Sequence, residues 1–508
     1  MTFERSVPMR YISARRTWFI YLVMECLSLI FFPNLSRSQE FLGLINGNYA
    51  GTNGLMINPA SMQNSKSYLH INLLSAGLFL DNNYLYLSKK EFQFFNLLNP
   101  SYKFQTHDME YGTEVRSAYT WGSPSNKHVY NNFRINGPSA MLIYGNHAVA
   151  LTTAVRNVIS MVHVPYDIAN FIYLGLNYKP QQGIIYEDDQ TVRAAQMTWG
   201  EIGLSYAYNI YRFNFDQVTA GVTLKKLYGY SGLYLYSREL NYVVPDDSTI
   251  NIINANAELG FSLPLDYNNT AFTNSNMVKG GGWGADIGFI YQRKLHSLQR
   301  NYFDHLCAQH FEDYLYRIGV SLLDFGAVTF KKQAEKHDFN NVGNYWLDVT
   351  DFKFRSISSF VDTVSTRFYG DGNASRVARK FTIWLPAAIS IQADYRYTKY
   401  WYINATFICG FPVAKASLIR PAMLSVAPRY ESKWFEVNLP VILYDWKYPH
   451  IGLSLRLGGL TIGTDKLGGF SKISNFEGMD VYVAIKYSFE KGSCGFRNFK
   501  RCIDMDIQ

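Results

Sequence analysis

Beyond its N-terminal region, the chain lacks any uninterrupted apolar run of the ~18 residues that a membrane-spanning helix needs. Charged residues are scarce at 17%, whereas hydrophobic residues make up 48% and aromatic residues 16% of the sequence. The apolar content is therefore spread through short segments, which excludes a bundle of membrane-spanning helices. Few charges and many aromatic residues are more typical of an exported membrane protein than of a cytosolic enzyme.

The charge distribution gives no sign of a nucleic-acid partner. The formal net charge is +8, and part of it comes from arginines near the N-terminus. In the rest of the chain, basic residues are interleaved with acidic ones and form no lysine- or arginine-rich stripe. Proteins that bind nucleic acid usually carry such a stripe, so we predict that this chain does not.

Cysteine is also rare, with 5 residues in the whole chain. Cys26 lies near the N-terminus, and Cys307 and Cys409 are isolated in the sequence. Cys494 and Cys502 share the C-terminal tail, where an oxidising compartment would allow them to form a disulfide. A free tail is the alternative, because no sequence rule fixes the pairing.

Signals for metal binding and catalysis are weak. His305, Cys307 and His310 are metal-ligand residue types, but their spacing matches no zinc signature and no fourth ligand is evident. The stretch KGGGWG at Lys279–Gly284 lacks the downstream Lys and Ser/Thr of a phosphate-binding loop. No GxSxG nucleophile motif is present. We therefore predict no metal, no cofactor, no catalytic residues and no enzymatic activity.

The N-terminus has the features of an export signal. Several arginines precede an apolar run at Trp18–Phe32, and Ser36 and Ser38 occupy the small-residue positions of a cleavage site. Glu25 interrupts the run, which is too short for a stable membrane-spanning helix. We predict a signal peptide over residues 1–38, and a permanent anchor is the alternative.

The last regular stretch, Asp480–Phe489, reads DVYVAIKYSF and alternates strictly between two faces. About ten residues of such alternation match a tilted strand that crosses an outer membrane. We predict that this strand closes a membrane β-barrel. Its lipid face would hold Val481, Val483, Ile485, Tyr487 and Phe489, and its lumen face Tyr482, Ala484, Lys486 and Ser488.

Alternation recurs along the chain, most clearly at 283–292 and 451–458, where the second face is small, polar or charged. A soluble sandwich alternates too, but the signal peptide, the aromatic content and the terminal strand favour a membrane barrel. We predict an all-β fold, a transmembrane antiparallel β-barrel, at residues 68–489, followed by a tail at 490–508. Another predicted strand is Tyr68–Leu80, with Asn82–Ser88 as its pairing partner. Further predicted strands are Ser139–Tyr144, Ala148–Arg156, Glu201–Tyr208, Val218–Leu227 and Ala255–Leu263.

Two long connections interrupt these strands, Lys294–Tyr314 and 332–379. Short turns of such barrels usually face the periplasm. If Arg396–Lys399 and Glu431–Lys433 are such turns, the 332–379 connection is extracellular. The extracellular assignment requires a further tight turn at Gly458 and Gly459, which lie between two alternating stretches.

The region before the first strand, residues 39–67, has no strand period. Gly47–Met62 is rich in Gly and Asn, which turn tightly. Asn58 precedes Pro59, so it is held extended, and its side chain can cap a turn. We predict a hatch inside the barrel lumen, and a disordered periplasmic leader is the alternative.

Five stretches together resemble the DUF5723 family of outer-membrane barrels over essentially the whole chain after the signal peptide. They are YAGTNGLMINPASM, GGGWGADIGFIY, YRIGVSLLDFGAVTF, FTIWLPAAISIQADYRYT and GGLTIGTDKLGGF. That family is in turn similar to the long-chain fatty acid transporter (FadL-like) barrels. The resemblance implies about 14 strands and an N-terminal hatch with an Asn-Pro-Ala motif, here Asn58, Pro59 and Ala60.

Two functions follow as hypotheses. The first is a plugged channel of the cell outer membrane for a small, hydrophobic molecule, which opens when Gly47–Met62 is removed. The alternative is a structural or assembly subunit that docks envelope proteins through its long loops. Either would contact outer-membrane lipid and, through the C-terminal strand, the barrel assembly machinery. A continuous apolar pocket beneath the hatch would favour transport, and a filled lumen with an apolar patch on the ordered loops would favour docking.

Overall fold

The computed structural model describes residues 41–99, 101–108, 115–269, 271, 277–296, 298, 306–349, 356–444, 449–470 and 473–492. The predicted signal peptide, His305, Cys494 and Cys502 lie outside these residues. Within them, no helix is both long enough and apolar enough to span a membrane.

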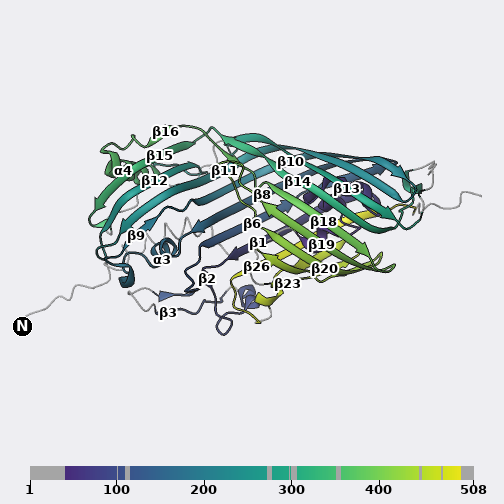
Figure 1. Cartoon of the computed structure of the whole chain (residues 1–508), viewed down its shortest axis with the longest axis horizontal. Coiled ribbons are helices and arrows are strands. Elements are labelled where there is room, and N and C mark those ends of the chain that lie inside the picture. The colour runs from purple at the N-terminus through teal and green to yellow at the C-terminus, as the bar shows by residue number, and fades with distance from the viewer. Residues whose placement is uncertain are drawn as a thin grey trace, which may run out of the picture.

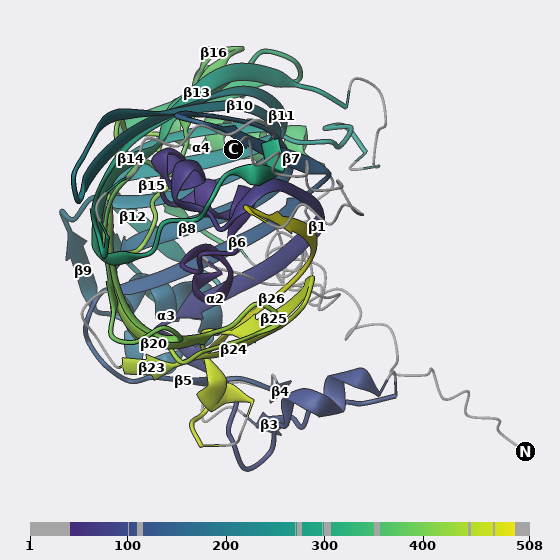
Figure 2. The same ribbon diagram turned by 90° about the vertical axis from the view of Figure 1, so that its right-hand side faces the viewer.

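Most of the strands form one antiparallel sheet that closes on itself (Figures 1 and 2), and two pairs of short strands lie outside it. β1 (Ser67–Asn82) pairs with β26 (Gly478–Glu490) at one edge and with β6 and β7 at the other. Several strands are interrupted, so that 22 segments make up 14 positions around the barrel. Closure leaves no sheet edge exposed to lipid. The predicted transmembrane antiparallel β-barrel of about 14 strands is confirmed.

Segments that continue one another share a position in the barrel. For example, β12 and β13 both pair with β11, one beyond the other. After β1, the next four positions are β6 (Lys127–Asn136) with β7 (Ser139–Tyr144), β8 (His147–Val164), β10 (Val192–Phe213) and β11 (Asp216–Val243). Three composite positions follow: β12 (Ile250–Ser262) with β13 (Gly280–Lys294), β14 (Tyr314–Phe330) with β15 (Glu335–Trp346), and β16 (Arg376–Ala378) with β17 (Phe381–Trp384) and β18 (Ala388–Arg396). The last six positions are β19 (Trp401–Gly410), β20 (Met423–Glu431), β21 (Phe435–Asn438) with β22 (Val441–Tyr444), β23 (Pro449–Ile451) with β24 (Leu453–Leu457), β25 (Leu460–Thr464) and β26.

Both ends of the barrel sequence lie at the same rim, because Ser67 at the start of β1 pairs with Glu490 at the end of β26. The tight turns after β7, β10, β18, β20 and β24 are at this rim too, and we call it the periplasmic rim because the short turns of outer-membrane barrels usually face the periplasm. Gly458 has a φ of 56°, a conformation that glycine adopts without strain, and it begins the turn between β24 and β25. The predicted division at Gly458 and Gly459 is confirmed.

The wall is much taller on one side than on the other. β11 has 28 residues and β10 has 22, whereas β24 and β25 have five each. The 332–379 connection was predicted without strands, and this is wrong for Glu335–Trp346, which forms β15 and pairs with β12. The β15 strand lacks an apolar face. It pairs near the outer end of the tall wall, where an apolar face is not required. The rest of the connection includes α4 (Ile357–Tyr369), capped by Ser356.

One predicted strand pairing is wrong. Asn82–Ser88 was expected to pair with the first strand, but only Leu85–Tyr86 is a strand, β2, and it pairs with β5 (Tyr119–Thr120). The stretch is too short to return along the wall, and β6 takes its place. β9 (Ile185–Asp188) shares the position of β10, because both pair with β11, one beyond the other. The remaining elements are η3 (Phe94–Leu98), β3 (His107–Asp108), β4 (Val115–Arg116), α3 (Tyr166–Leu174), η4 (Lys179–Gln181), η5 (Leu306–Ala308) and η7 (Leu467–Gly469).

The closing strand presents the two faces that its sequence predicts. Val483 and Ile485 are exposed on the outside, whereas Tyr482, Ala484 and Lys486 are buried on the lumen side. Ile485 pairs with Leu74 of β1 and Leu460 of β25, which are also exposed. A continuous apolar surface therefore crosses the joint where the barrel closes.

We expect Ile485→Arg to reduce the outer-membrane yield of the folded barrel severely. A charge on the lipid face costs about 2 to 4 kcal/mol near mid-bilayer. Ala484→Ser changes the neighbouring residue on the lumen side and serves as the control. Equal yields of heat-modifiable barrel for both variants would show that the two faces are assigned wrongly.

Inside the barrel lies the chain before β1, which we call the luminal segment and define as residues 41–66. It contains α2 (Leu42–Ile45), η1 (Gly51–Met56) and η2 (Pro59–Asn64), and most of its residues are buried. Figure 2, a view along the barrel, shows its purple ribbon within the ring of strands. The segment ends at the periplasmic rim, where Lys66 leads directly into β1.

Candidate functional site

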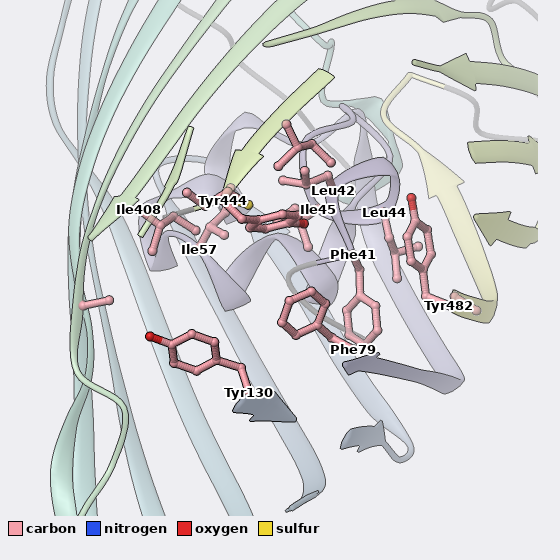
Figure 3. Packing of buried hydrophobic residues seen from close by; sticks show 14 of the residues in the cluster. Phe41, Leu42, Leu44, Ile45, Ile57, Phe79, Tyr130, Ile408, Tyr444 and Tyr482 are labelled. Carbon is pink, nitrogen blue, oxygen red and sulfur yellow. The ribbon is translucent and has the colours of Figure 1, made fainter. Parts of the chain in front are cut away.

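The first contact of the luminal segment is apolar. Phe41 and three residues of α2 pack against side chains that project into the lumen from the wall (Figure 3). The ring of Phe41 meets the ring of Tyr482 edge-on, with centroids 5.7 Å apart. Burying each large apolar side chain contributes about 1.5 to 3 kcal/mol. The wall side of this contact consists of Phe79, Tyr130, Val162, Ala388, Ile408, Met423, Ile442, Tyr444, Tyr482 and Ala484.

A buried carboxylate fastens the segment at the periplasmic rim. Glu431 of β20 accepts hydrogen bonds from the backbone and side-chain nitrogens of Asn48, at 3.1 and 3.0 Å. It also forms a 2.8 Å ion pair with Lys66. Burial by itself lowers the pKa of Lys66, but the Glu431 carboxylate outweighs this and raises the pKa above its ordinary value. Lys66 is therefore held in its charged form.

Two arginines of the wall bind the same part of the segment. The backbone carbonyl of Asn46 accepts hydrogen bonds from Arg429, at 2.7 Å, and from Arg317, at 3.0 Å. Both guanidinium groups also pair with Asp394, at 3.2 and 2.8 Å. The wall thus supplies charged partners for backbone groups that would otherwise be buried without any.

The predicted motif residues lie together at the turn that begins η2. Asn58 is extended, and its Oδ1 accepts a hydrogen bond of 2.9 Å from the backbone nitrogen of Ala60, with Pro59 at the first helical position. Its Nδ2 donates to the carbonyl of Phe289, at 3.2 Å, and to Oε1 of Gln392, at 3.0 Å. The side chain therefore both shapes the turn and attaches it to the wall.

Glycines in three adjacent strands make room for this turn. Gly221 of β11 pairs with Gly288 of β13, and Gly319 lies in the next strand, β14. A Cβ at Gly221 would lie 2.5 Å from the backbone nitrogen of Ala60, and one at Gly319 would lie 2.9 Å from Nδ2 of Asn58. A Cβ at Gly288 would overlap the Asn58 side chain. Any larger residue here would push the turn out of the wall.

A stretch from the predicted Lys294–Tyr314 connection covers the segment from the periplasmic side. Residues 306–313, which we call the strap, cross the opening in front of the luminal segment in Figure 2. Gln309 reaches the turn after β7, where it accepts a hydrogen bond of 3.1 Å from the Gly145 nitrogen. The ring of Phe311 lies 5.4 Å from the Lys66 ammonium. Removal of the luminal segment therefore requires the strap to move.

The sequence position of Cys307, in the strap, suggested an isolated cysteine. In the structure, however, Cys307 is disulfide-bonded. Its partner is outside the described residues, and Cys409 is free. The carbonyl of Cys307 accepts a hydrogen bond of 2.7 Å from the Gly492 nitrogen, just before the tail cysteines. A disulfide between Cys494 and Cys502 stays a prediction, and it holds only if Cys307 pairs with neither. The spacing of the cysteines in the sequence does not reveal which of them pair, because folding brings together residues that are distant in the sequence.

Outward of the luminal segment, charged side chains from six strands and one loop form a buried layer across the lumen. Asp324 of β14 pairs with Arg156 at 3.0 Å, with Lys225 at 2.7 Å and with Arg420 at 2.7 Å. Lys225 also pairs with Asp286, at 2.7 Å. Next to this group, Arg134 pairs with Glu201, at 2.9 Å. We call these seven residues the ionic layer.

Asp324 occupies an unusual backbone position. Its φ is 52°, which costs energy for any residue but glycine, although aspartate tolerates it better than most. The pairing of β13 with β14 shifts at this point, which indicates a β-bulge. The bulge buries the side chains of both Leu323 and Asp324. Strained residues persist where the surroundings hold them, and they often mark functional sites.

No prediction from the sequence included the ionic layer. Its one visible signal was the appearance of Asp286 on the inward face of the alternating run at 283–292. Lys225 likewise alternates with the exposed residues Val222 and Leu224. Inward charges were read as the ordinary lining of a water-filled lumen, and which of them meet across the lumen depends on closure of the barrel.

The spaces that remain are small. A cavity of about 40 Å³ lies between the luminal segment and Arg317, Gln392 and Asp394. Another of about 20 Å³ lies between β1, β6 and β8 on one side and Pro386 and Ile419 on the other. One water molecule needs a cavity volume of about 10 to 15 Å³, so each of these cavities can hold a few water molecules at most. In this state, passage through the lumen requires parts of the protein to move.

Comparison with known proteins places the chain in a family. A family model described as a family of unknown function, DUF5723, matches residues 59–465. No curated protein matches the chain. The P. putida toluene transporter TodX is similar at 10% identity with a TM-score of 0.40, over 90% of this chain and 100% of its own. A Pseudomonas aeruginosa FadL homologue is similar at 9% identity with a TM-score of 0.38, over 90% and 99%.

Those two likenesses are distant, so the function has to be argued from this chain's own residues. The family match, by contrast, begins within the Asn-Pro-Ala motif and ends just after β25, and it spans most of the barrel. The chain therefore belongs to the DUF5723 family.

Proposed function

We propose that the protein is a non-enzymatic channel of the outer membrane, closed by its own luminal segment, that carries a small hydrophobic molecule. The observation that supports this most directly is the apolar contact of α2. Phe41, Leu42, Leu44 and Ile45 cover an apolar area of the wall that faces the lumen. An apolar molecule of similar size would be stabilised by the same wall residues if α2 moved away.

The fastening of the luminal segment is compatible with movement. Beyond its apolar contact, it is held by hydrogen bonds and ion pairs to Glu431, Arg429 and Gln392, which water can replace. The motif residues Asn58, Pro59 and Ala60 would act as the fixed point of the hatch, because they are set into the wall. The small cavities beside the luminal segment and beyond it support a closed state.

The test is binding of an apolar dye, N-phenyl-1-naphthylamine, to the purified barrel in detergent. We expect the double variant Phe41→Ser, Ile45→Ser to bind the dye about tenfold more tightly than wild type, because α2 competes less well for the wall. Leu55→Ser is the matched control, since Leu55 packs against a different cluster.

Equal dye affinity in wild type, double variant and control would refute the apolar site. Without dye binding, recovery of an envelope protein bound to the outer loops would favour the alternative, a docking subunit.

A further inference from the structure

The loop between β19 and β20, residues 411–422, folds into the barrel at its outer side. We call it the inward loop. Although it is a connection between two strands, Ser417, Leu418 and Arg420 are buried. Surface loops rarely bury this much, because their backbone groups then need partners. The backbone groups of Ala416 and Leu418 find such partners in Trp384, at 2.9 and 3.0 Å.

The inward loop spans the whole width of the lumen. It starts from β19 and β20, the ninth and tenth of the fourteen strand positions, and contacts β8, the third. The backbone nitrogen of Ile419 donates a hydrogen bond of 3.0 Å to Oγ of Ser160 in β8. Arg193 of β10 donates one of 3.1 Å to the carbonyl of Ala414. A loop fastened to the opposite wall blocks the path between.

Apolar side chains fill the space around the inward loop. Ala416 and Leu418 belong to a buried cluster of lumen-facing residues. This cluster leaves little room for solvent, so the lumen is closed here independently of the luminal segment. Its wall residues are Val158, Ala195, Met197, Trp199, Leu227, Tyr234, Val328, Phe330, Ala334, Phe381, Ile383 and Leu385.

One ion pair ties the inward loop to the ionic layer. Arg420 donates to Oδ2 of Asp324 at 2.7 Å. The two other cations on Asp324, Arg156 and Lys225, come from strands and are fixed in the wall. Arg420 is the partner whose backbone belongs to a loop. Loss of this pair would leave both strand cations paired with Asp324 and release the loop alone.

We propose that the inward loop is a second closure of the barrel, in series with the luminal segment, and that the Arg420–Asp324 pair is its latch. The proposal rests on the proposed function in one respect, that the barrel is a channel. It changes the expected effect of removing Gly47–Met62. With the inward loop still latched, that deletion alone leaves the barrel closed, and a path opens only when both closures are released.

The experiment compares potassium chloride currents in planar bilayers. Wild type, the deletion of residues 47–62 and the single variant Arg420→Gln are each expected to give only background current. The deletion combined with Arg420→Gln is expected to give at least tenfold more. Asp324→Asn in the deletion background should act alike, because asparagine also tolerates the positive φ. Lys415→Gln is the matched control, since Lys415 lies in the same loop but is mostly exposed.

Current from the deletion alone that equals the current of the combined variant would overturn the proposal. A second measurement uses the full-length chain, in case the combined variant fails to fold. Cysteines at Ser160 and Ile419, with Cys409→Ser, should cross-link readily in otherwise wild-type protein and about tenfold more slowly with Arg420→Gln. An unchanged rate would show that Arg420 is no latch. Currents here need no apolar cargo, so failure of the dye experiment and failure of the latch are read separately.

Discussion

Replacing Gly288 with valine is expected to drive the luminal segment out of the lumen while the barrel stays closed as a sheet. The Cβ of a side chain at this position would overlap Asn58 and would lie 3.0 Å from Cδ of Pro59. The cap on Ala60 and the bonds to Phe289 and Gln392 would then be lost. Overpacking costs about 1 to 3 kcal/mol and loss of a helix cap about 1 kcal/mol.

Hydrogen–deuterium exchange measures this directly. A loss of about 3 kcal/mol corresponds to roughly a hundredfold faster exchange of the luminal-segment amides, if they exchange through local release. Gly281→Val is the control, because it introduces the same residue in the same strand, where the nearest atom is 3.5 Å from its Cβ. In protein that lacks residues 47–62, Gly288→Val should have little effect on thermal stability, since its clash partners are gone.

Unchanged protection of the luminal segment in Gly288→Val would mean that the turn at Asn58 is not seated in the wall as described. Equal effects of Gly288→Val and Gly281→Val would instead point to a general weakening of β13.

Glu431→Gln is expected to release the periplasmic part of the luminal segment. The change keeps the shape of the side chain but removes the charge that Lys66 and Arg429 share. Breaking a buried ion pair on one side costs about 3 to 5 kcal/mol, because the remaining charges stay buried. Trypsin cleavage after Lys66 should become at least tenfold faster in folded barrels. Asp216→Asn is the control, since its pair with Arg293 is at the exposed rim.

The same contact predicts a dependence on pH. The pKa of Lys66 is raised in the folded protein, so its pair with Glu431 stabilises the segment fully below the ordinary pKa of 10.5. This stability is lost as the pH rises through the higher, folded value. Trypsin can be replaced by an alkaline-stable protease to follow cleavage in this range. Cleavage of Glu431→Gln at the wild-type rate, at neutral pH, would contradict the role of Glu431.

The barrel wall could be predicted from the sequence because its signal is local. Alternation with a period of two places Val483 and Ile485 on one face and Ala484 and Lys486 on the other, whatever strand pairs with them. The paired glycines at Gly458 marked a turn for the same reason, since one residue's backbone freedom is enough to specify it. The Asn-Pro-Ala motif was found through its resemblance to a family, not through any period.

Where a strand has no apolar face, this signal fails. Glu335–Trp346 was predicted as part of a loop, yet it continues β14 and pairs with β12 near the outer end of the barrel. The strand is specified by its backbone pairing with β12. Pairing partners that lie nearly a hundred residues apart in the sequence leave no mark in a local pattern. Only the tertiary structure could assign it to the wall.

The contents of the lumen were decided by the tertiary structure alone. The sequence determined that charged residues such as Lys225 and Asp286 face inward, because alternation fixes the face of each residue. It could not determine that Asp324 meets Arg420, because the two lie on different elements and a bulge turns Asp324 inward. Contacts across a lumen depend on the number of strands, their register and the closure of the sheet, which are properties of the whole chain.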